Sequence, residues 1–174
     1  YGSLVGQLAA QAQPELLDGL IAFGYPVRPG VAVTPPELAA ASVPPARANT
    51  AAAAASDFIT PGTISKAAQA AFVAQALDAD PVRVDWRMLE QWNALDPGRL
   101  RIPTLLIQGA RDPLALDLEH ARLFRGIDHT DKRWVVLPHG DHAAFMESSR
   151  TDFLRVIDTF TAPDRPPPPV ATGE

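Results

Sequence analysis

Cysteine is absent from the 174 residues, and lysine is scarce, with only Lys66 and Lys132 against thirteen arginines. Without cysteine, the chain can form neither a disulfide framework nor a thiolate metal site. The formal net charge is −5 and no run of Lys or Arg occurs, which argues against a nucleic-acid partner because phosphate contacts need clustered cations. No apolar run reaches the roughly 18 residues that span a bilayer, and no signal peptide is visible. We therefore expect no membrane partner and a cytoplasmic location.

What is present is typical of a globular protein, with 47% hydrophobic and 20% charged residues. The scarcity of lysine and the abundance of alanine favour a GC-rich bacterial source. Three short, continuous apolar runs are typical of strands that are covered on both faces. They lie at 19–23 ("GLIAF"), 103–108 (within "IPTLLIQG") and 133–138 ("RWVVLP").

Helical patterns alternate with these strands. We expect helices at 2–13, 64–78, 85–94, 114–126 and 148–160, the last one amphipathic with a capping box formed by Ser149 and Asp152. This alternation predicts an α/β fold with a mostly parallel sheet flanked by helices.

The proline-rich segments indicate where the chain divides into regions. Residues 1–29 and 99–162 form the predicted core, and 30–98, rich in Pro and Ala, form a helical cap inserted between core elements. The Pro-rich tail 163–174 has nothing to pack and is expected to be disordered.

Two polar side chains follow the ends of neighbouring predicted strands. Asp112 comes three residues after Gly109, and His142 lies in the loop after the run at 133–138. Ligands of parallel sheets bind beyond the carboxyl ends of the strands, so the carboxylate can meet the imidazole there. Such a pair suits general base catalysis, with the carboxylate fixing the tautomer of the histidine.

From Tyr1 to about Thr161 the sequence resembles the α/β-hydrolase superfamily of the serine esterase type. In that family "PTLLIxGxxD" bears the catalytic acid and "GDHAAF" is similar to the histidine loop. The resemblance implies the C-terminal part of an α/β-hydrolase fold, with Asp112 as the acid and His142 as the histidine.

The resemblance also explains the first residues. "YG" matches the last two letters of the nucleophile elbow GxSxG, which places the nucleophilic serine immediately before Tyr1 and the backbone N–H of Tyr1 in the oxyanion hole. Ser3 is the alternative nucleophile, but Tyr1 and Val5 stand where the elbow needs small residues. We expect an upstream N-terminal part of the same protein to complete the sheet, joined through a modified serine or separated by cleavage.

Other interpretations of these residues stay open. Asp112 could simply cap the following helix, and His142 could be a buried structural histidine, with His139 as its rival. Asp141 is expected to shape the turn. His120 and His129 are expected at the surface. The four histidines do not indicate a zinc site, because no third ligand is in register with the two that lie close together, His139 and His142. No cofactor is implied.

The predicted function is hydrolysis of an ester, thioester, lactone or amide of a small to medium apolar substrate through an acyl-enzyme. Alternatives are an epoxide hydrolase or dehalogenase of the same fold with an Asp nucleophile, and a hydrolase-like binding protein without turnover. The apolar side chains of the cap are the candidate substrate contacts, with burial in the cap as their alternative: Phe58, Ile59, Trp86, Leu89 and Trp92.

Overall fold

The computed structural model describes residues 2–24, 47–82 and 89–163. Its sheet has three strands, β1 (Leu20–Phe23), β2 (Thr104–Gly109) and β3 (Lys132–Leu137), in the order β1-β2-β3. Both pairings are parallel, which confirms the predicted sheet, and each strand lies within one residue of its predicted position. The strands therefore end at one edge, where β1, β2 and β3 present their following loops.

Burial explains why the apolar runs form strands. All six residues of the central strand β2 are buried, as expected for a strand covered on both faces. Two clusters of apolar side chains cover it. One contains Leu106 with Leu4 and Leu123, and the other contains Leu105 with Phe153 and Phe160. The sheet is therefore the middle layer of three.

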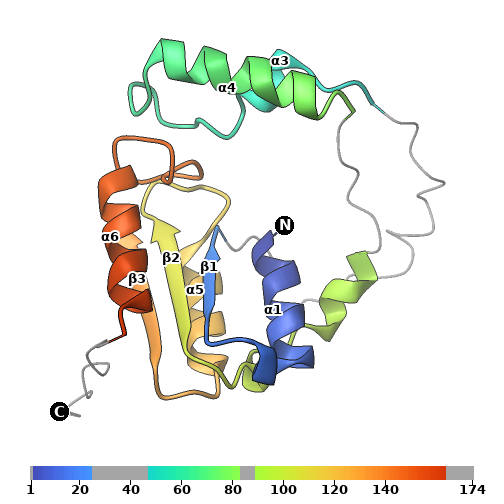
Figure 1. The fold of residues 1–174 in the computed structure, drawn as a ribbon, viewed down its shortest axis with the longest axis vertical. Helices are drawn as coiled ribbons and strands as arrows, with labels where there is room; N and C mark the ends of the chain where they lie inside the picture. Colours follow the sequence, from blue (N-terminus) through green and yellow to red (C-terminus); the bar gives the residue numbers. More distant parts are fainter. Residues whose placement is uncertain (1, 25–46, 83–88, 164–174) are drawn as a thin grey trace.

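Helices form the outer layers (Figure 1). Helix α1 (Gly2–Ala12) packs beside β1, and helix α5 (Asp117–Gly126) contributes Leu123 to the same cluster. Helix α6 (Arg150–Thr161) supplies Phe153 and Phe160 to the opposite cluster. None of the helices in the described residues is long and apolar enough to cross a membrane.

Residues 47–82 lie over the carboxyl ends of the strands (Figure 1). They contain α3 (Ala51–Ala54) and α4 (Lys66–Ala79), capped by the hydroxyls of Thr50 and Ser65. The turn between the helices is hydrogen-bonded to the loop after β3, since the amide of Ser148 donates to the carbonyl of Thr63 over 2.8 Å. This part of the predicted cap thus covers the edge where Asp112 and His142 are found.

Residues 89–98, which we expected in the cap, pack against the core instead. They form the 3-10 helices η2 (Leu89–Ala94) and η3 (Pro97–Arg99). Trp92 is buried in the cluster that contains Leu4, and the amide of Asp96 donates to the side chain of Gln11 on α1 over 2.9 Å. A short 3-10 helix, η1 (Pro14–Leu16), follows α1.

Two local predictions were wrong. Ser149 does not form a capping box, because its buried hydroxyl donates to the carbonyl of Ala144 and makes no cap hydrogen bond to α6. The helix predicted at 114–126 begins only at Asp117, since the preceding residues form the loop that carries Asp112. Most of the helix predicted at 85–94, and the tail from residue 164, lie outside the described residues.

Candidate active site

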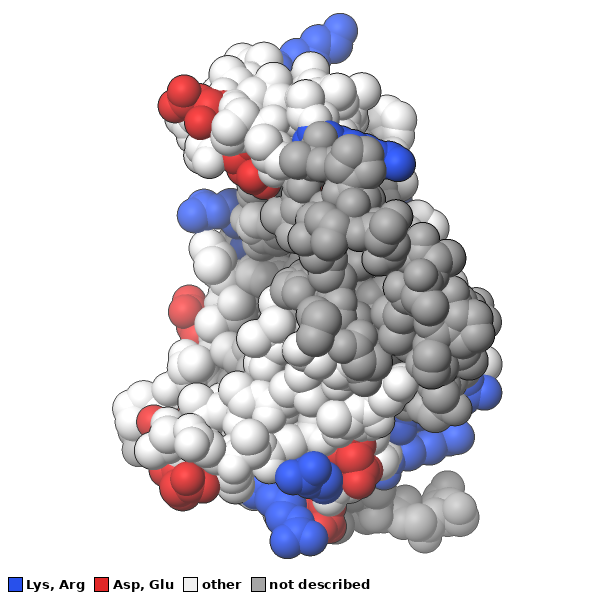
Figure 2. Space-filling model, turned by 90° about the vertical axis from the view of Figure 1, so that its right-hand side faces the viewer, with Lys and Arg blue, Asp and Glu red and all other residues white. Residues whose placement is uncertain are grey.

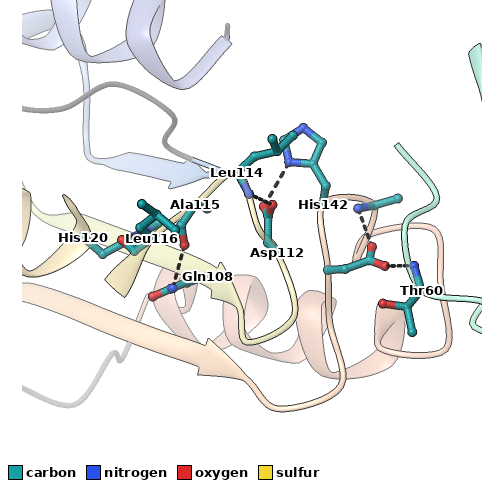
Figure 3. Close-up of polar contacts among 10 residues, drawn as sticks. Thr60, Gln108, Asp112, Leu114, Ala115, Leu116, His120 and His142 are labelled. Atoms are coloured by element: carbon teal, nitrogen blue, oxygen red, sulfur yellow. Dashed lines mark hydrogen bonds and ion pairs between the residues drawn. The ribbon is translucent and has the colours of Figure 1, made fainter. Parts of the chain in front are cut away.

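The predicted pairing of Asp112 with His142 is present. The Nδ1 atom of His142 lies 2.9 Å from Oδ2 of Asp112, and the two side chains point toward each other from neighbouring loops (Figure 3). The Asp112 side chain is fully buried, whereas that of His142 is 28% exposed. An ionised carboxylate only accepts hydrogen bonds, so Nδ1 carries the proton and Nε2 is free to accept one.

Backbone and side-chain hydrogen bonds fix the loop that carries Asp112. Its Oδ1 atom accepts the amide proton of Leu114 over 2.9 Å, so the carboxylate closes its own turn and does not cap α5. Further along this loop, the carbonyl of Ala115 accepts from Nε2 of the buried Gln108 over 2.8 Å (Figure 3). The indole N–H of Trp134 donates to Oε1 of Gln108 over 3.0 Å. The side chain of Gln108, near the end of β2, therefore anchors the loop that carries Asp112.

The acid loop and the histidine loop touch through their backbones. The amide of Arg111 donates to the carbonyl of Gly140 over 3.0 Å. At Gly109, a Cβ atom would lie 2.7 Å from the carbonyl oxygens of Gly140 and Asp141, closer than real Cβ contacts allow. Glycine is required at position 109 because the two loops approach this closely.

Gly24, which directly follows β1, is a site residue that the sequence analysis missed. Its φ is +62°, and a Cβ there would lie 3.3 Å from Cε1 of His142. The backbone of β1 thus forms one wall of the site. The available signal was its position, since Gly24 ends an apolar run as Gly109 does.

The electrostatics favour the protonated form of His142 more than in a free histidine. The hydrogen bond to Asp112 raises the pKa of His142 above its usual 6.5; burial opposes this, and the charges of Asp112 and Asp57 add to the rise. A carboxylate that stabilises imidazolium is the partner a general base needs.

A cavity of about 300 Å³ lies against His142. Phe58, a candidate substrate contact, lines it together with Gly2 and Ser3 from the start of α1. The larger side chains of the lining are mostly apolar, Phe23, Phe72, Phe145 and Met146, with Asp57 as the charged one besides His142. Ile59 is half-buried and does not contribute to this lining among the described residues. Trp92 is buried in the core cluster that contains Leu4, so it lies neither in this lining nor in the cap, where its burial was the expected alternative.

Three predicted residues lie outside this description. Tyr1 and Trp86 are not among the described residues, and only the backbone of Leu89 is described. The oxyanion role of the Tyr1 backbone and the substrate contacts of Trp86 and Leu89 therefore stay predictions.

The remaining polar candidates have other partners. His139 is exposed, and Asp141 shapes the histidine loop by accepting the Ala143 amide over 3.0 Å. The prediction that His120 lies at the surface was wrong. It is 1% exposed and stacks on Trp134, because its face of α5 turns toward β3. The described residues contain no group of three or more potential metal ligands.

The match to known families extends over most of the chain. A profile of the Hydrolase_4 family, serine aminopeptidase S33, matches residues 1–149. The chain belongs to this α/β-hydrolase family. No curated protein sequence matches this chain. Like other Hydrolase_4 proteins it has the α/β-hydrolase fold, here seen as a parallel sheet between helices.

Solved structures support the fold of this Hydrolase_4 chain. A thioesterase domain from the curacin biosynthetic pathway is 15% identical, with a TM-score of 0.57 over 89% of this chain and 63% of that one. A thermophilic esterase is 22% identical, with a TM-score of 0.61 over 91% and 61%. A hydrolase from Pseudomonas aeruginosa PA01 is 19% identical, with a TM-score of 0.62 over 92% and 61%. The chain thus spans less than two thirds of the length of these structures.

Charge is mixed on the surface of the Hydrolase_4 chain. Figure 2 shows Lys and Arg side chains next to Asp and Glu side chains at the lower end of the molecule. Ion pairs such as Arg101 with Asp128, 3.5 Å apart, and Arg155 with Asp152, 2.6 Å apart, are exposed. Exposed pairs of this kind contribute little to stability.

Proposed function

We propose that this chain carries the acid, the base and the cover of a serine-type hydrolase that cleaves an ester, thioester, lactone or amide of a small to medium apolar substrate. The observation that carries the proposal is the 2.9 Å hydrogen bond from His142 to the fully buried carboxylate of Asp112, beside an apolar cavity. In this arrangement the carboxylate of Asp112 holds Nδ1 of His142, and Nε2 is oriented toward a ligand.

The nucleophile in this proposal is a serine immediately before Tyr1. The start of α1 supports that position, since Gly2 and Ser3 line the same cavity as His142. Ser3 remains the rival within the chain, and its buried hydroxyl has no hydrogen-bond partner in the described residues. An upstream part of the same protein would supply both the serine and further strands beside β1.

The chemistry divides into two acyl transfers. Nε2 of His142 takes the proton from the serine hydroxyl as the oxygen attacks the substrate carbonyl. The same proton then passes to the leaving alcohol, thiol or amine as its bond to the acyl carbon breaks. In the second transfer His142 deprotonates water, which attacks the acyl-enzyme and releases the acid and the free serine. Asp112 stabilises the imidazolium in both transfers.

The preference for an apolar substrate rests on the cavity. Phe58 and Phe72 meet edge to face, with ring centroids 5.2 Å apart, and form its cover from residues 47–82. Phe23 and Phe145 form the floor, with centroids 6.2 Å apart. Solved structures with this fold include proteins titled as an esterase and a thioesterase domain, which agrees with acyl chemistry.

The test uses p-nitrophenyl esters of increasing chain length with the intact natural protein. His142→Ala is expected to lower kcat/KM at least about 10³-fold, as for loss of a triad histidine, while His139→Ala, the matched exposed histidine, leaves it unchanged. Equal activity of wild type and His142→Ala contradicts the proposal.

A fluorophosphonate probe distinguishes the nucleophiles. Peptide mapping is expected to find the adduct on the serine preceding Tyr1, and an adduct on Ser3 would move the nucleophile into this chain. An unlabelled protein that opens epoxides or removes halide from haloalkanes supports the Asp-nucleophile alternative. Ligand binding without turnover of any of these substrates supports the binding-protein alternative.

A further inference from the structure

Two buried carboxyl groups, Asp141 and Glu147, belong to the loop that carries the candidate base His142. Asp141, next to His142, is completely buried, and Glu147 is 5% exposed. Within the described residues, no Lys, Arg or His forms an ion pair with either of them. Buried carboxylates without a cation are costly, so their hydrogen bonds have to explain their presence.

Those hydrogen bonds lead to one turn of the covering segment. The amide of Thr60 donates to Oδ2 of Asp141 over 2.7 Å, and Figure 3 shows Thr60 beside the histidine loop. The hydroxyl of Thr63 lies 2.7 Å from Oε1 of Glu147, and its carbonyl accepts the amide of Ser148. Three contacts thus join the turn at 60–63 to the loop that carries His142.

The geometry at Thr63 requires a proton on Glu147. The single hydroxyl proton of Thr63 faces two acceptors at 2.7 Å, the carbonyl of Thr60 and Oε1 of Glu147. Both are satisfied only if the hydroxyl donates to the carbonyl and Glu147, as a carboxylic acid, is itself a donor. The other oxygen, Oε2, is buried with no hydrogen-bond partner in the described residues, which an ionised carboxylate would not tolerate.

We propose that Glu147 is a neutral acid that donates to the hydroxyl of Thr63, and that Glu147 and the Asp141 carboxylate act together as a clasp that fastens the 60–63 turn to the histidine loop. They are positioning residues: they hold Phe58 over the cavity and the His142 loop beneath it. Thr60 and Thr63 face the pair from the covering segment, and the Ala143 amide faces it from the histidine loop. The consequence for catalysis rests on the proposed function, whereas the clasp itself does not.

The electrostatics agree with a neutral Glu147 beside an ionised Asp141. Burial raises the pKa of Glu147 to about 7, and the hydrogen bond and charge of Asp141 add to the rise against the opposing Thr63 bond. For Asp141, burial alone acts to raise the pKa, but hydrogen bonds from Ala143, Thr60 and Glu147 bring it below the usual value. The proton therefore resides on Glu147, and it is lost as the pH rises through neutrality.

Four variants separate the roles. Glu147→Gln retains a donor for the hydroxyl of Thr63, so it copies the protonated acid at every pH. Glu147→Ala removes the contact with Thr63. Asp141→Asn keeps the shape but leaves one oxygen to serve two backbone amides. Asp152→Asn on the exposed face of α6 is the matched control for an Asp-to-Asn change.

The first measurement is amide hydrogen exchange of the intact natural protein at Thr60 and Ser148, corrected for intrinsic rates. In wild type, protection at both amides is expected to fall above about pH 7, and in Glu147→Gln it is expected to stay constant. Asp141→Asn is expected to exchange about tenfold faster at Thr60, the factor for losing one charge-assisted hydrogen bond. Glu147→Ala is expected to exchange faster at Ser148, because the amide of Ser148 donates to Thr63, which loses its contact with Glu147. Asp152→Asn is expected to match wild type.

The second measurement is ester hydrolysis. Because the clasp positions the cover, Glu147→Ala is expected to raise KM more than it lowers kcat. Glu147→Gln is expected to have the KM and kcat of wild type, and to keep that KM at alkaline pH. A parallel His142→Ala variant separates the two hypotheses. If it retains activity, the proposed function fails, and the exchange data alone then decide the clasp.

Equal exchange at Ser148 in wild type and Glu147→Ala, or at Thr60 in wild type and Asp141→Asn, would overturn the clasp. The same pH dependence in wild type and Glu147→Gln would overturn the neutral Glu147. If Glu147→Ala fails to fold, the comparison of wild type with Glu147→Gln still decides, because that variant retains every contact.

Discussion

Gly24 at the end of β1 lies directly against the ring of His142. A Cβ atom at Gly24 would be 3.3 Å from Cε1 and 3.6 Å from Nδ1 of His142, and 4.0 Å from Oδ2 of Asp112. The end of β1 thus limits the position of the His142 ring, although more than a hundred residues of sequence separate the two.

Gly24→Ala is expected to lower both activity and stability. The positive φ of +62° costs an alanine about 1–2 kcal/mol, and the new methyl group also displaces the imidazole. Gly62→Ala is the matched control, because Gly62 has a φ of +83° and nothing within 4 Å of its added Cβ. Thermal unfolding is expected to shift similarly in both variants, with kcat reduced only in Gly24→Ala. Equal kcat in the two variants would contradict the contact.

Asp112→Asn is expected to lower kcat about 10⁴-fold with little change in folding. The amide can still accept the Leu114 proton, but its NH₂ group favours the wrong tautomer of His142. Ester hydrolysis and far-UV circular dichroism measure the two effects. Asp128→Asn, at an exposed ion pair, is the control and is expected to behave as wild type. Activity of Asp112→Asn near wild type would refute the role of Asp112.

The acidic limb of the pH profile of kcat/KM, where activity falls as the pH drops, is expected to have its midpoint above pH 6.5. His142 must be neutral to accept a proton, and its hydrogen bond with Asp112 raises its pKa, so protonation removes the base at a higher pH than for a free histidine. Asp112→Asn is expected to move this limb toward lower pH. A limb that stays in place after the substitution shows that another group titrates there.

His120 is expected to make the fold acid-sensitive. Burial lowers its pKa from 6.5, so the unfolded chain binds a proton that the folded chain refuses. The free energy of unfolding therefore falls as the pH drops below 6.5. His120→Phe keeps a ring on Trp134 and removes the titration, so urea unfolding of this variant is expected to show a shallower slope between pH 5 and 6.5. An unchanged slope would assign the acid sensitivity elsewhere.

The strands and the Asp112–His142 pair could be predicted from the sequence because both depend on local pattern. A strand covered on both faces must be continuously apolar, as "TLLI" in β2 is. In a parallel sheet the loops after neighbouring strands meet at one edge, so an acid and a histidine in those loops come together wherever the strands are found.

The missed features depend on contacts outside the helix or strand that each pattern describes. His120 carries a polar side chain, and its ring stacks on the ring of Trp134 on β3. The hydroxyl of Ser149 has a local alternative in the carbonyl of Ala144, which the capping pattern cannot reveal. The contact of Glu147 with Thr63 joins residues that are 84 positions apart in the sequence.

The close approach at Gly109 has a consequence for engineering new substrate preferences. No side chain fits between the β2 end and the carbonyls of Gly140 and Asp141, so the acid and the base cannot be re-aimed independently by mutation. Substitutions at Phe58 and Phe72 change the shape of the cavity and leave the close backbone contact at Gly109 intact. Libraries for directed evolution of this scaffold belong on the covering segment, with Gly109 and Gly140 held fixed.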